Sequence, residues 1–220
     1  MSVEPGQQTA ESGVRLETLL SPATLREKRS HVLIVGPALS GKLDVGLELL
    51  AAVAQDGDAI SVSTTDPADQ VQAEYDAAGG AVDALSVVDA TAGVTNRSEE
   101  VYSVSTPGDL TGIGIAIAQA TDAVEDPAPP VLIDSLSALL MYNDAETVYQ
   151  FAESVRTQTR GGAGVTISTL NTDALDDPDR NRLLGLASVV VETRITEDGR
   201  REFQVRDDER TGEWHSRTGT

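Results

Sequence analysis

The stretch HVLIVGPALSGKLDVGLELL, residues 31–50, constrains the fold more than any other part of the chain. An unbroken apolar run, HVLIV, leads into a short loop with two glycines, and a helical pattern follows from Leu43 to Ala54. A continuous apolar run is typical of a strand buried on both faces, as in parallel sheets that helices cover. The stretch therefore predicts the first strand, loop and helix of an α/β domain.

The same alternation of apolar runs and helical patterns continues along the chain. Further strands are predicted at 59–63, 85–90, 131–134, 164–169, 188–195 and 201–207, with 101–106 either another strand or a sheet edge. Helices are predicted at 43–54, 67–79, 109–124, 145–159 and 177–187, and a shorter one before Pro22. The last two strands flank TEDG, a hairpin turn with Gly199 at the bend. This order predicts a three-layer α/β fold with a mostly parallel central sheet and a C-terminal antiparallel hairpin.

The domain organisation follows from length and composition. The 220 residues, 40% of them apolar, suit a single domain, for which we expect residues 13–211. Residues 1–12 are polar and are predicted to be a disordered tail, residues 91–100 a polar loop and residues 212–220 a flexible tail. No apolar run reaches the ~18 residues of a membrane helix, cysteine is absent, and the N-terminus lacks a signal pattern. We therefore expect a cytoplasmic protein.

The charge of the chain limits its partners. The chain has 36 acidic residues against 16 Lys and Arg, a net charge of −20, and only two of the basic residues are lysines. Such an acidic, lysine-poor composition resembles proteins of salt-loving archaea, where high salt screens the repulsion between carboxylates. The alternative is an ordinary acidic protein with an acidic binding face. Nucleic-acid binding needs a basic stripe, which so acidic a chain does not favour. We therefore expect protein partners rather than nucleic acid, and either a monomer or a homo-oligomer.

The loop itself carries the sharpest motif. GPALSGKL, residues 36–43, matches the first seven positions of the phosphate-binding pattern G-x-x-x-x-G-K-[ST]. Gly41 lets backbone N–H groups approach phosphate, the helix N-terminus adds partial positive charge, and Lys42 reaches the terminal phosphates. The predicted nucleotide-binding residues are Gly36, Pro37, Ala38, Leu39, Ser40, Gly41, Lys42 and Leu43. The alternative is a tight turn with a solvated lysine.

A second motif completes the predicted site, and one position departs from it. VLID ends in Asp134, an acid placed to hold Mg²⁺ through water, although a helix cap is the simpler role. Leu43 stands where the motif has a hydroxyl that binds Mg²⁺ directly. Ser40, Thr64 or Thr65 could compensate. ATP and Mg²⁺ are therefore possible ligands.

These motifs together resemble the RecA-like P-loop ATPases, in particular the archaeal KaiC and GvpD branch. The resemblance covers about residues 14 to 210 and rests on GPALSGK, AISVSTTDP, VLIDSLSALL, GVTISTLN and FQVRD. It implies a RecA-like P-loop fold for the three-layer domain.

The resemblance also implies roles for individual residues. The family places two glutamates after its second strand, one of which activates water; here Thr64 and Thr65 stand there, and Asp66 is the candidate base. The family presents a Lys and an Arg from its last strands to a neighbouring subunit's nucleotide; Arg206 remains, and Gln204 replaces the Lys. Asn171 falls where a polar residue senses the terminal phosphate, although a loop contact is an alternative.

Three departures thus meet at one site: the Mg²⁺ hydroxyl, the base and one cation. They favour a degenerate protein that binds nucleotide weakly or not at all and has a regulatory or protein-interaction role. The alternative is a slow, Mg²⁺-dependent ATPase whose base is Asp66 or comes from a neighbouring chain. A third possibility is a scaffold without a ligand.

Overall fold

The computed structural model describes residues 14–91, 100–125, 128–158, 164–174, 176–207 and 210–217. The predicted tail 1–12, residues 92–99 of the predicted polar loop and residues 218–220 lie outside this part of the chain.

Nine strands of the described residues form one sheet in the order β4-β3-β2-β5-β6-β1-β7-β8-β9. The strands are β1 (His31–Gly36), β2 (Ala59–Ser63), β3 (Leu85–Asp89), β4 (Val101–Ser103), β5 (Val131–Asp134), β6 (Thr166–Asn171), β7 (Val189–Ile195), β8 (Arg201–Asp207) and β9 (His215–Ser216). Neighbouring strands from β4 to β7 pair in parallel, and β8 and β9 are antiparallel. The sheet is therefore mostly parallel with a C-terminal antiparallel edge, as predicted.

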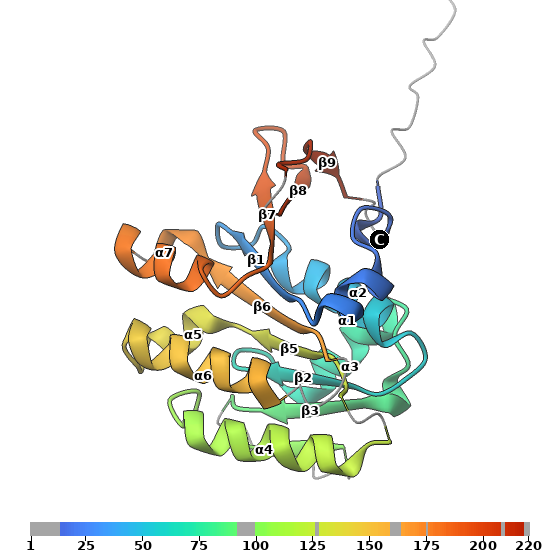
Figure 1. The fold of residues 1–220 in the computed structure, drawn as a ribbon, viewed down its shortest axis with the longest axis vertical. Coiled ribbons are helices and arrows are strands. Elements are labelled where there is room, and N and C mark those ends of the chain that lie inside the picture. Colours follow the sequence, from blue (N-terminus) through green and yellow to red (C-terminus); the bar gives the residue numbers. More distant parts are fainter. Residues whose placement is uncertain are drawn as a thin grey trace, which may run out of the picture.

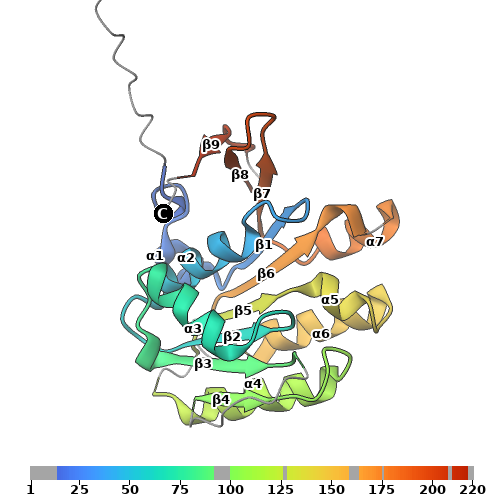
Figure 2. The same ribbon diagram turned by 180° about the vertical axis from the view of Figure 1, so that it is seen from behind.

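Helices cover both faces of the sheet, so the domain has three layers (Figure 1; Figure 2). The helices are α1 (Pro22–Lys28), α2 (Lys42–Ala54), α3 (Ala68–Ala77), α4 (Leu110–Ala123), α5 (Leu136–Leu140), α6 (Ala145–Gln158) and α7 (Asp177–Leu184). Helices α4 to α7 lie on the face seen in Figure 1, and α1 to α3 lie on the opposite face.

The apolar runs are continuous because each strand contributes to two cores. Val32 and Ile34 of β1 belong to the core under α1 to α3, whereas Leu33 and Val35 belong to the core under α4 to α7. Successive side chains of a strand point to opposite faces, so a strand covered on both sides needs apolar residues at every position. All six residues of β1 are buried accordingly.

Two helices were not predicted. The sequence suggested a helix that ends before Pro22, but only a 3₁₀ turn (Leu16–Thr18) lies there, and α1 begins at Pro22 itself. Ser21 caps α1 by accepting a hydrogen bond from the Thr24 N–H (3.4 Å), and proline suits the first helical position because it needs no N–H donor there. Helix α5 is a short turn capped by Ser135 directly after β5.

Residues 212–217, for which a flexible tail is predicted, include a strand and a residue that contact the rest of the domain. Strand β9 pairs with β8, and the Arg217 side chain binds Asp44 and Glu48 of α2 at 2.6 Å each. The composition of this segment is that of an ordinary turn. Its contacts depend on the register between β8 and β9, which composition does not indicate.

A buried histidine at the far end of β1 makes stability depend on pH. His31 is 1% exposed, its Nε2 lies 3.0 Å from Ser168 Oγ, and its Nδ1 has no hydrogen-bond partner among the described residues. Burial lowers the pKa of His31 from 6.5 to about 4; Arg156 acts in the same direction and Glu153 opposes it. The folded protein therefore keeps this imidazole neutral where the unfolded chain protonates it.

We expect His31 to cost the fold about 3 kcal/mol of unfolding free energy as the pH falls from 6.5 towards 4. As the pH falls, the unfolded state binds the proton first. The stability that comes from neutral His31 is therefore complete above pH 6.5 and is lost as the pH falls towards 4. Urea unfolding of wild type and His31→Gln at several pH values measures this, because the carboxylates common to both proteins cancel in the difference. A difference between the two proteins that does not vary with pH would contradict the expectation.

Candidate functional site

The loop that follows β1 has the strand–loop–helix geometry of a phosphate-binding loop. Strand β1 ends at Gly36 and α2 begins at Lys42, so residues 37–41 lie at the carboxyl edge of the sheet (Figure 1). Gly41 caps α2 with φ +83°, a left-handed conformation that glycine adopts without steric cost. Leu39 is also left-handed, at φ +63°, and its side chain is 82% exposed.

Gly36 is required by a close approach rather than by its own dihedral angles. A Cβ at Gly36 would lie 2.2 Å from Thr193 Oγ1 and 2.5 Å from the Thr193 backbone oxygen. Thr193 belongs to β7 and donates a hydrogen bond to the Val35 oxygen (3.1 Å). The loop therefore leaves the sheet directly against β7.

Lys42 is folded back onto the loop. Its Nζ donates to the Pro37 oxygen (2.5 Å) and to Ser40 Oγ (3.4 Å), and the residue is only 8% exposed. Burial lowers the pKa of the Lys42 ammonium group, while the carboxylates of Asp134 and Asp173 act in the opposite direction. Among the described residues, two acceptors thus hold the ammonium group within the loop, and its third N–H donor could bind a phosphate.

Asp134 ends β5, which β6 separates from β1. It is 9% exposed, and the Thr169 hydroxyl of β6 donates a hydrogen bond to its Oδ1. Burial raises the pKa of Asp134, the Thr169 hydrogen bond opposes this, Asp66 raises it further and Lys42 lowers it. The fold therefore brings Lys42 and Asp66 within electrostatic reach of Asp134.

The hydroxyl groups that could replace the one missing at Leu43 are engaged elsewhere. Ser40 Oγ donates to the Pro37 oxygen (2.8 Å) and lies 2.6 Å from Thr193 Oγ1. Thr64 Oγ1 donates to the Asp134 backbone oxygen and accepts from the Ser135 N–H, both at 2.9 Å. Thr65 Oγ1 donates to Asp66 Oδ2 (3.1 Å). These bonds fix the orientation of Ser40 and Thr64 within the loop and between the two strand ends. Thr64 Oγ1 both donates and accepts, whereas Thr65 Oγ1 only donates and keeps its lone pairs.

The position of Leu43 itself explains why a hydroxyl is absent. Its side chain is half-buried and packs against the core under α1 to α3. Within the described ranges, no group of three or more His, Cys, Asp or Glu side chains could hold a metal ion. Among the described residues, the loop N–H groups and Lys42 suit a phosphate, and Asp134 stays the candidate for holding Mg²⁺.

The two remaining predicted residues lie differently with respect to the loop. Asn171 pairs in register with Gly36, beside the loop, and its N–H donates to Ser137 Oγ (2.7 Å). Arg206 pairs with Val190, which in turn pairs with Leu33 in the middle of the sheet, and its guanidinium binds Glu192 (3.2 Å). Arg206 thus forms an ion pair within its own chain, away from Lys42.

Sequence reasoning missed three residues that contact the loop. Thr193 approaches it from β7, and Arg201 and Arg217 approach it from the C-terminal strands. The TEDG turn offered one signal, since the hairpin pairs Arg201 with Ile195 at the carboxyl end of β7. Nothing in the local sequence indicated the position of Arg217.

A family model matches residues 29–193, about three quarters of the chain, and it describes a family of unknown function, DUF7504. The chain belongs to this family. The matched residues of this DUF7504 protein include the whole loop, Asp66, Asp134 and Asn171, whereas Arg201, Arg206 and Arg217 lie beyond the match. No protein of curated function matches the chain.

Two solved structures share the fold. A KaiC-like protein of the archaeon Pyrococcus horikoshii has a TM-score of 0.61 at 14% identity, over 86% of this chain and 84% of that protein. An uncharacterized protein of the same organism, in complex with an unknown peptide, has a TM-score of 0.59 at 15% identity, over 84% of this chain and 89% of that one. The DUF7504 domain therefore has the fold of KaiC-like, RecA-type proteins.

Proposed function

We propose that this domain is a degenerate P-loop protein that binds the phosphates of a nucleotide weakly, hydrolyses them poorly and acts through protein partners. One contrast carries the proposal. Lys42 is buried at the end of the loop, whereas the hydroxyl position of the motif holds a half-buried leucine that packs against the core. This contrast supports retained phosphate binding together with the loss of one metal ligand.

Phosphate binding draws on groups that the chain retains. The N–H groups of residues 38–43 and the N-terminus of α2 attract anions, and Lys42 supplies the positive charge. ATP is the ligand that the KaiC-like fold favours. Mg²⁺ would reach the protein only through Asp134, by way of water, so we propose that it contributes little to the affinity.

Hydrolysis is the weaker side of the site. The positions of the expected glutamates hold Thr64, whose hydroxyl binds backbone atoms, and the exposed Thr65. Asp66 keeps the alternative of a slow Mg²⁺-dependent ATPase open, because its charge acts on Asp134 and it is the nearest carboxylate in sequence to the missing base.

Exposed apolar side chains support a protein partner. Leu39, in the loop, is 82% exposed in a left-handed conformation that costs an ordinary residue about 1 kcal/mol, so glycine would suit the position better. Met141 and Tyr142, 79% and 60% exposed, follow α5, and Tyr142 lies against Gly108, before α4. Exposed apolar groups of this size can mark interaction sites when a partner covers them.

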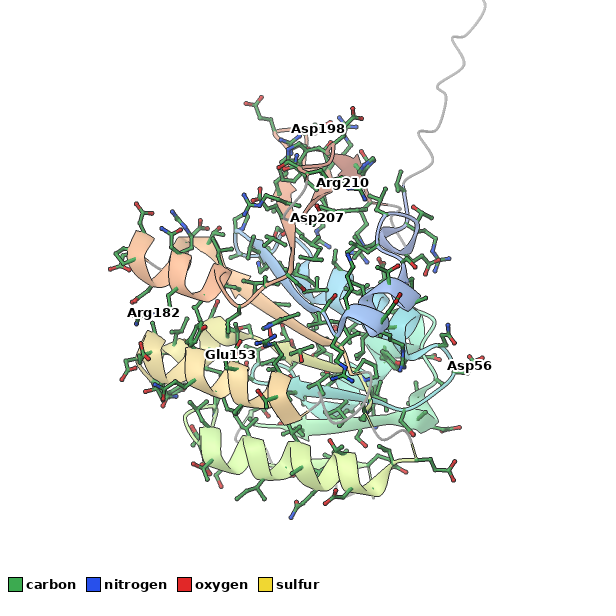
Figure 3. The ribbon with its side chains drawn as sticks, viewed as in Figure 1. Asp56, Glu153, Arg182, Asp198, Asp207 and Arg210 are labelled. Carbon is green, nitrogen blue, oxygen red and sulfur yellow. The ribbon has the colours of Figure 1, made fainter. Side chains whose placement is uncertain are left out.

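The surface charge supports a cytoplasm with a high salt concentration, as in salt-loving archaea. Figure 3 shows charged side chains around the whole outline, among them Asp198, Asp207 and Arg210 near the C-terminal strands. Exposed Arg–Asp pairs such as Arg200–Asp198 contribute little to stability, because water and salt screen them. Such pairs cannot offset the repulsion between carboxylates in a chain with a net charge of −20, whereas a high salt concentration would screen this repulsion. Within the described residues, no helix has the length and apolar character needed to cross a membrane.

Thermal unfolding with and without Mg·ATP tests nucleotide binding. In about 2 M KCl, a ligand at about a hundred times its Kd adds about 2.7 kcal/mol to the stability of the folded state. We expect a dose-dependent rise in Tm for wild type and none for Lys42→Ala. Lys28→Ala is the matched control, because Lys28 is the only other lysine and lies exposed at the end of α1. No rise in wild type at any concentration would favour a scaffold without a ligand.

A further inference from the structure

Two arginines from the C-terminal strands converge on the start of α2. The position that a Cβ would take at Gly41 lies 3.2 Å from Arg201 Cδ and 3.4 Å from Arg217 Nη1. Arg201 begins β8, and Arg217 follows β9. The open side of Gly41, the residue before the loop lysine, therefore faces two cationic side chains of the same chain.

One carboxylate oxygen of Asp44 binds both Arg201 and Arg217. Asp44 Oδ2 accepts from Arg217 Nη1 (2.6 Å) and from Arg201 Nη1 (3.2 Å), and it lies 3.3 Å from the same Cβ position at Gly41. Asp44 belongs to the first turn of α2, two residues after Lys42. A carboxylate thus fills the place where two guanidinium groups and a helix N-terminus would otherwise meet an anion.

Arg217 is held in place independently of Asp44, whereas the side chain of Arg201 is not. Arg217 Nη2 also binds Glu48 Oε1 (2.6 Å), and its side chain is only 14% exposed. The backbone of Arg201 lies at the end of a regular β7–β8 ladder, opposite Ile195, but its side chain is 50% exposed and is held by Asp44. If the charge of Asp44 were removed, the Arg217 guanidinium would remain beside the loop and the Arg201 guanidinium could turn towards another anion.

We propose that Arg201 and Arg217 bind the phosphate group of a nucleotide that extends beyond the loop, and that Asp44 competes with this phosphate for their N–H groups. The inference rests on the proposed function, since it requires that the loop bind phosphate. A guanidinium group presents paired donors that match phosphate as well as carboxylate, so one anion can replace the other. The competitor would make nucleotide binding weak and would place part of the binding site outside the P-loop motif.

Calorimetric titration with two probes, ATP and inorganic tripolyphosphate, tests this proposal in about 0.5 M KCl, which leaves short-range charge effects measurable. We expect Asp44→Asn to bind both probes about tenfold more tightly than wild type, and Arg201→Gln to bind them about tenfold more weakly. Asp69→Asn, in the first turn of α3, and Arg200→Gln, next to Arg201, are controls with the same changes of charge. Tighter binding of ATP than of tripolyphosphate would identify a nucleotide as the ligand, and equal binding would identify a polyphosphate.

A double variant separates binding from a structural role. If Asp44 restrains the arginines, the gain from Asp44→Asn should shrink in the Arg201→Gln background, because one of the released groups is missing. Arg201 is half exposed, so its variant should fold even if Arg217 variants do not.

The outcomes distinguish this inference from the proposed function. The inference would be overturned if Asp44→Asn had the same affinity as Asp69→Asn, and Arg201→Gln the same affinity as Arg200→Gln. Loss of binding in Lys42→Ala would in that case leave the P-loop function standing. The ion pairs would then serve only to attach the C-terminal segment to α2. Binding by Asp44→Asn where wild type shows none would support the inference. No binding by any variant would overturn both.

Discussion

Replacing Gly36 by alanine should destabilise the domain by about 3 kcal/mol or more, a large share of the stability of a typical domain. The new methyl group would lie 2.2 Å from Thr193 Oγ1 and 2.5 Å from the Thr193 backbone oxygen. The hydroxyl cannot simply turn away, because it is bonded to Val35 and lies against Ser40. Relief would require β1 and β7 to separate at the point where the loop begins.

Gly114→Ala is the matched control for this substitution. Gly114 lies within α4, and a Cβ there would meet nothing within 4 Å. Alanine should therefore stabilise the helix by about 0.5–1 kcal/mol. Urea unfolding followed by circular dichroism compares the two variants with wild type. Equal stability of the two variants would show that β7 does not approach Gly36 as closely as described.

The parallel part of the fold could be predicted because burial on both faces leaves a plain signature. Every residue of β1, β2, β3 and β5 is buried, so each strand appears as an apolar or small-residue run between helical patterns. Helix α1 was not predicted, because a proline can mark either the end of one helix or the start of the next, and Pro22 was assigned to the end of the preceding one. A serine before a proline satisfies both capping preferences, and this signal was available.

The positions of the site residues could be predicted, but their hydrogen bonds could not. Lys42 and Asp66 follow parallel strands and Asp134 ends one, and the carboxyl ends of such strands share one edge of the sheet. Whether a hydroxyl at that edge is available depends on distant partners: Ser40 meets Thr193, and Thr64 meets Asp134. Periodicity carries no information on such contacts. The same holds for Arg217, whose position requires the pairing of β9 with β8.

ATP turnover provides the other large effect. We expect this protein to hydrolyse ATP at least about 10³-fold more slowly than the 1–100 s⁻¹ typical of protein kinases. In the proposed site the loop holds phosphate and Asp134 is the one candidate metal ligand, while Thr64 and Thr65 occupy the positions where the resemblance implies glutamates. These groups stabilise the transition state rather than the bound nucleotide, so their loss lowers the rate more than the affinity.

Release of phosphate over hours, from protein purified alongside its variants, measures this turnover. In a degenerate protein, the residual signal should be equal in wild type, Lys42→Ala, Asp134→Asn and Asp66→Asn, because a trace contaminant would then be its source. In a slow ATPase, all three variants should lose it, and omission of Mg²⁺ should abolish it. Equal signals would discard the ATPase, and a loss in all three would discard the degenerate interpretation.

Restoring the motif hydroxyl alone should not recover turnover. Leu43 packs against the core under α1 to α3, so Leu43→Thr removes apolar contacts and should destabilise the domain by about 1–3 kcal/mol. The variant would still lack a base at positions 64 and 65. If Leu43→Thr nevertheless gave a Mg²⁺-dependent rate well above wild type, then a competent base must be present, either Asp66 or a group from a neighbouring chain. The leucine would in that case be the only barrier to hydrolysis, and the protein would be an ATPase disabled at a single residue.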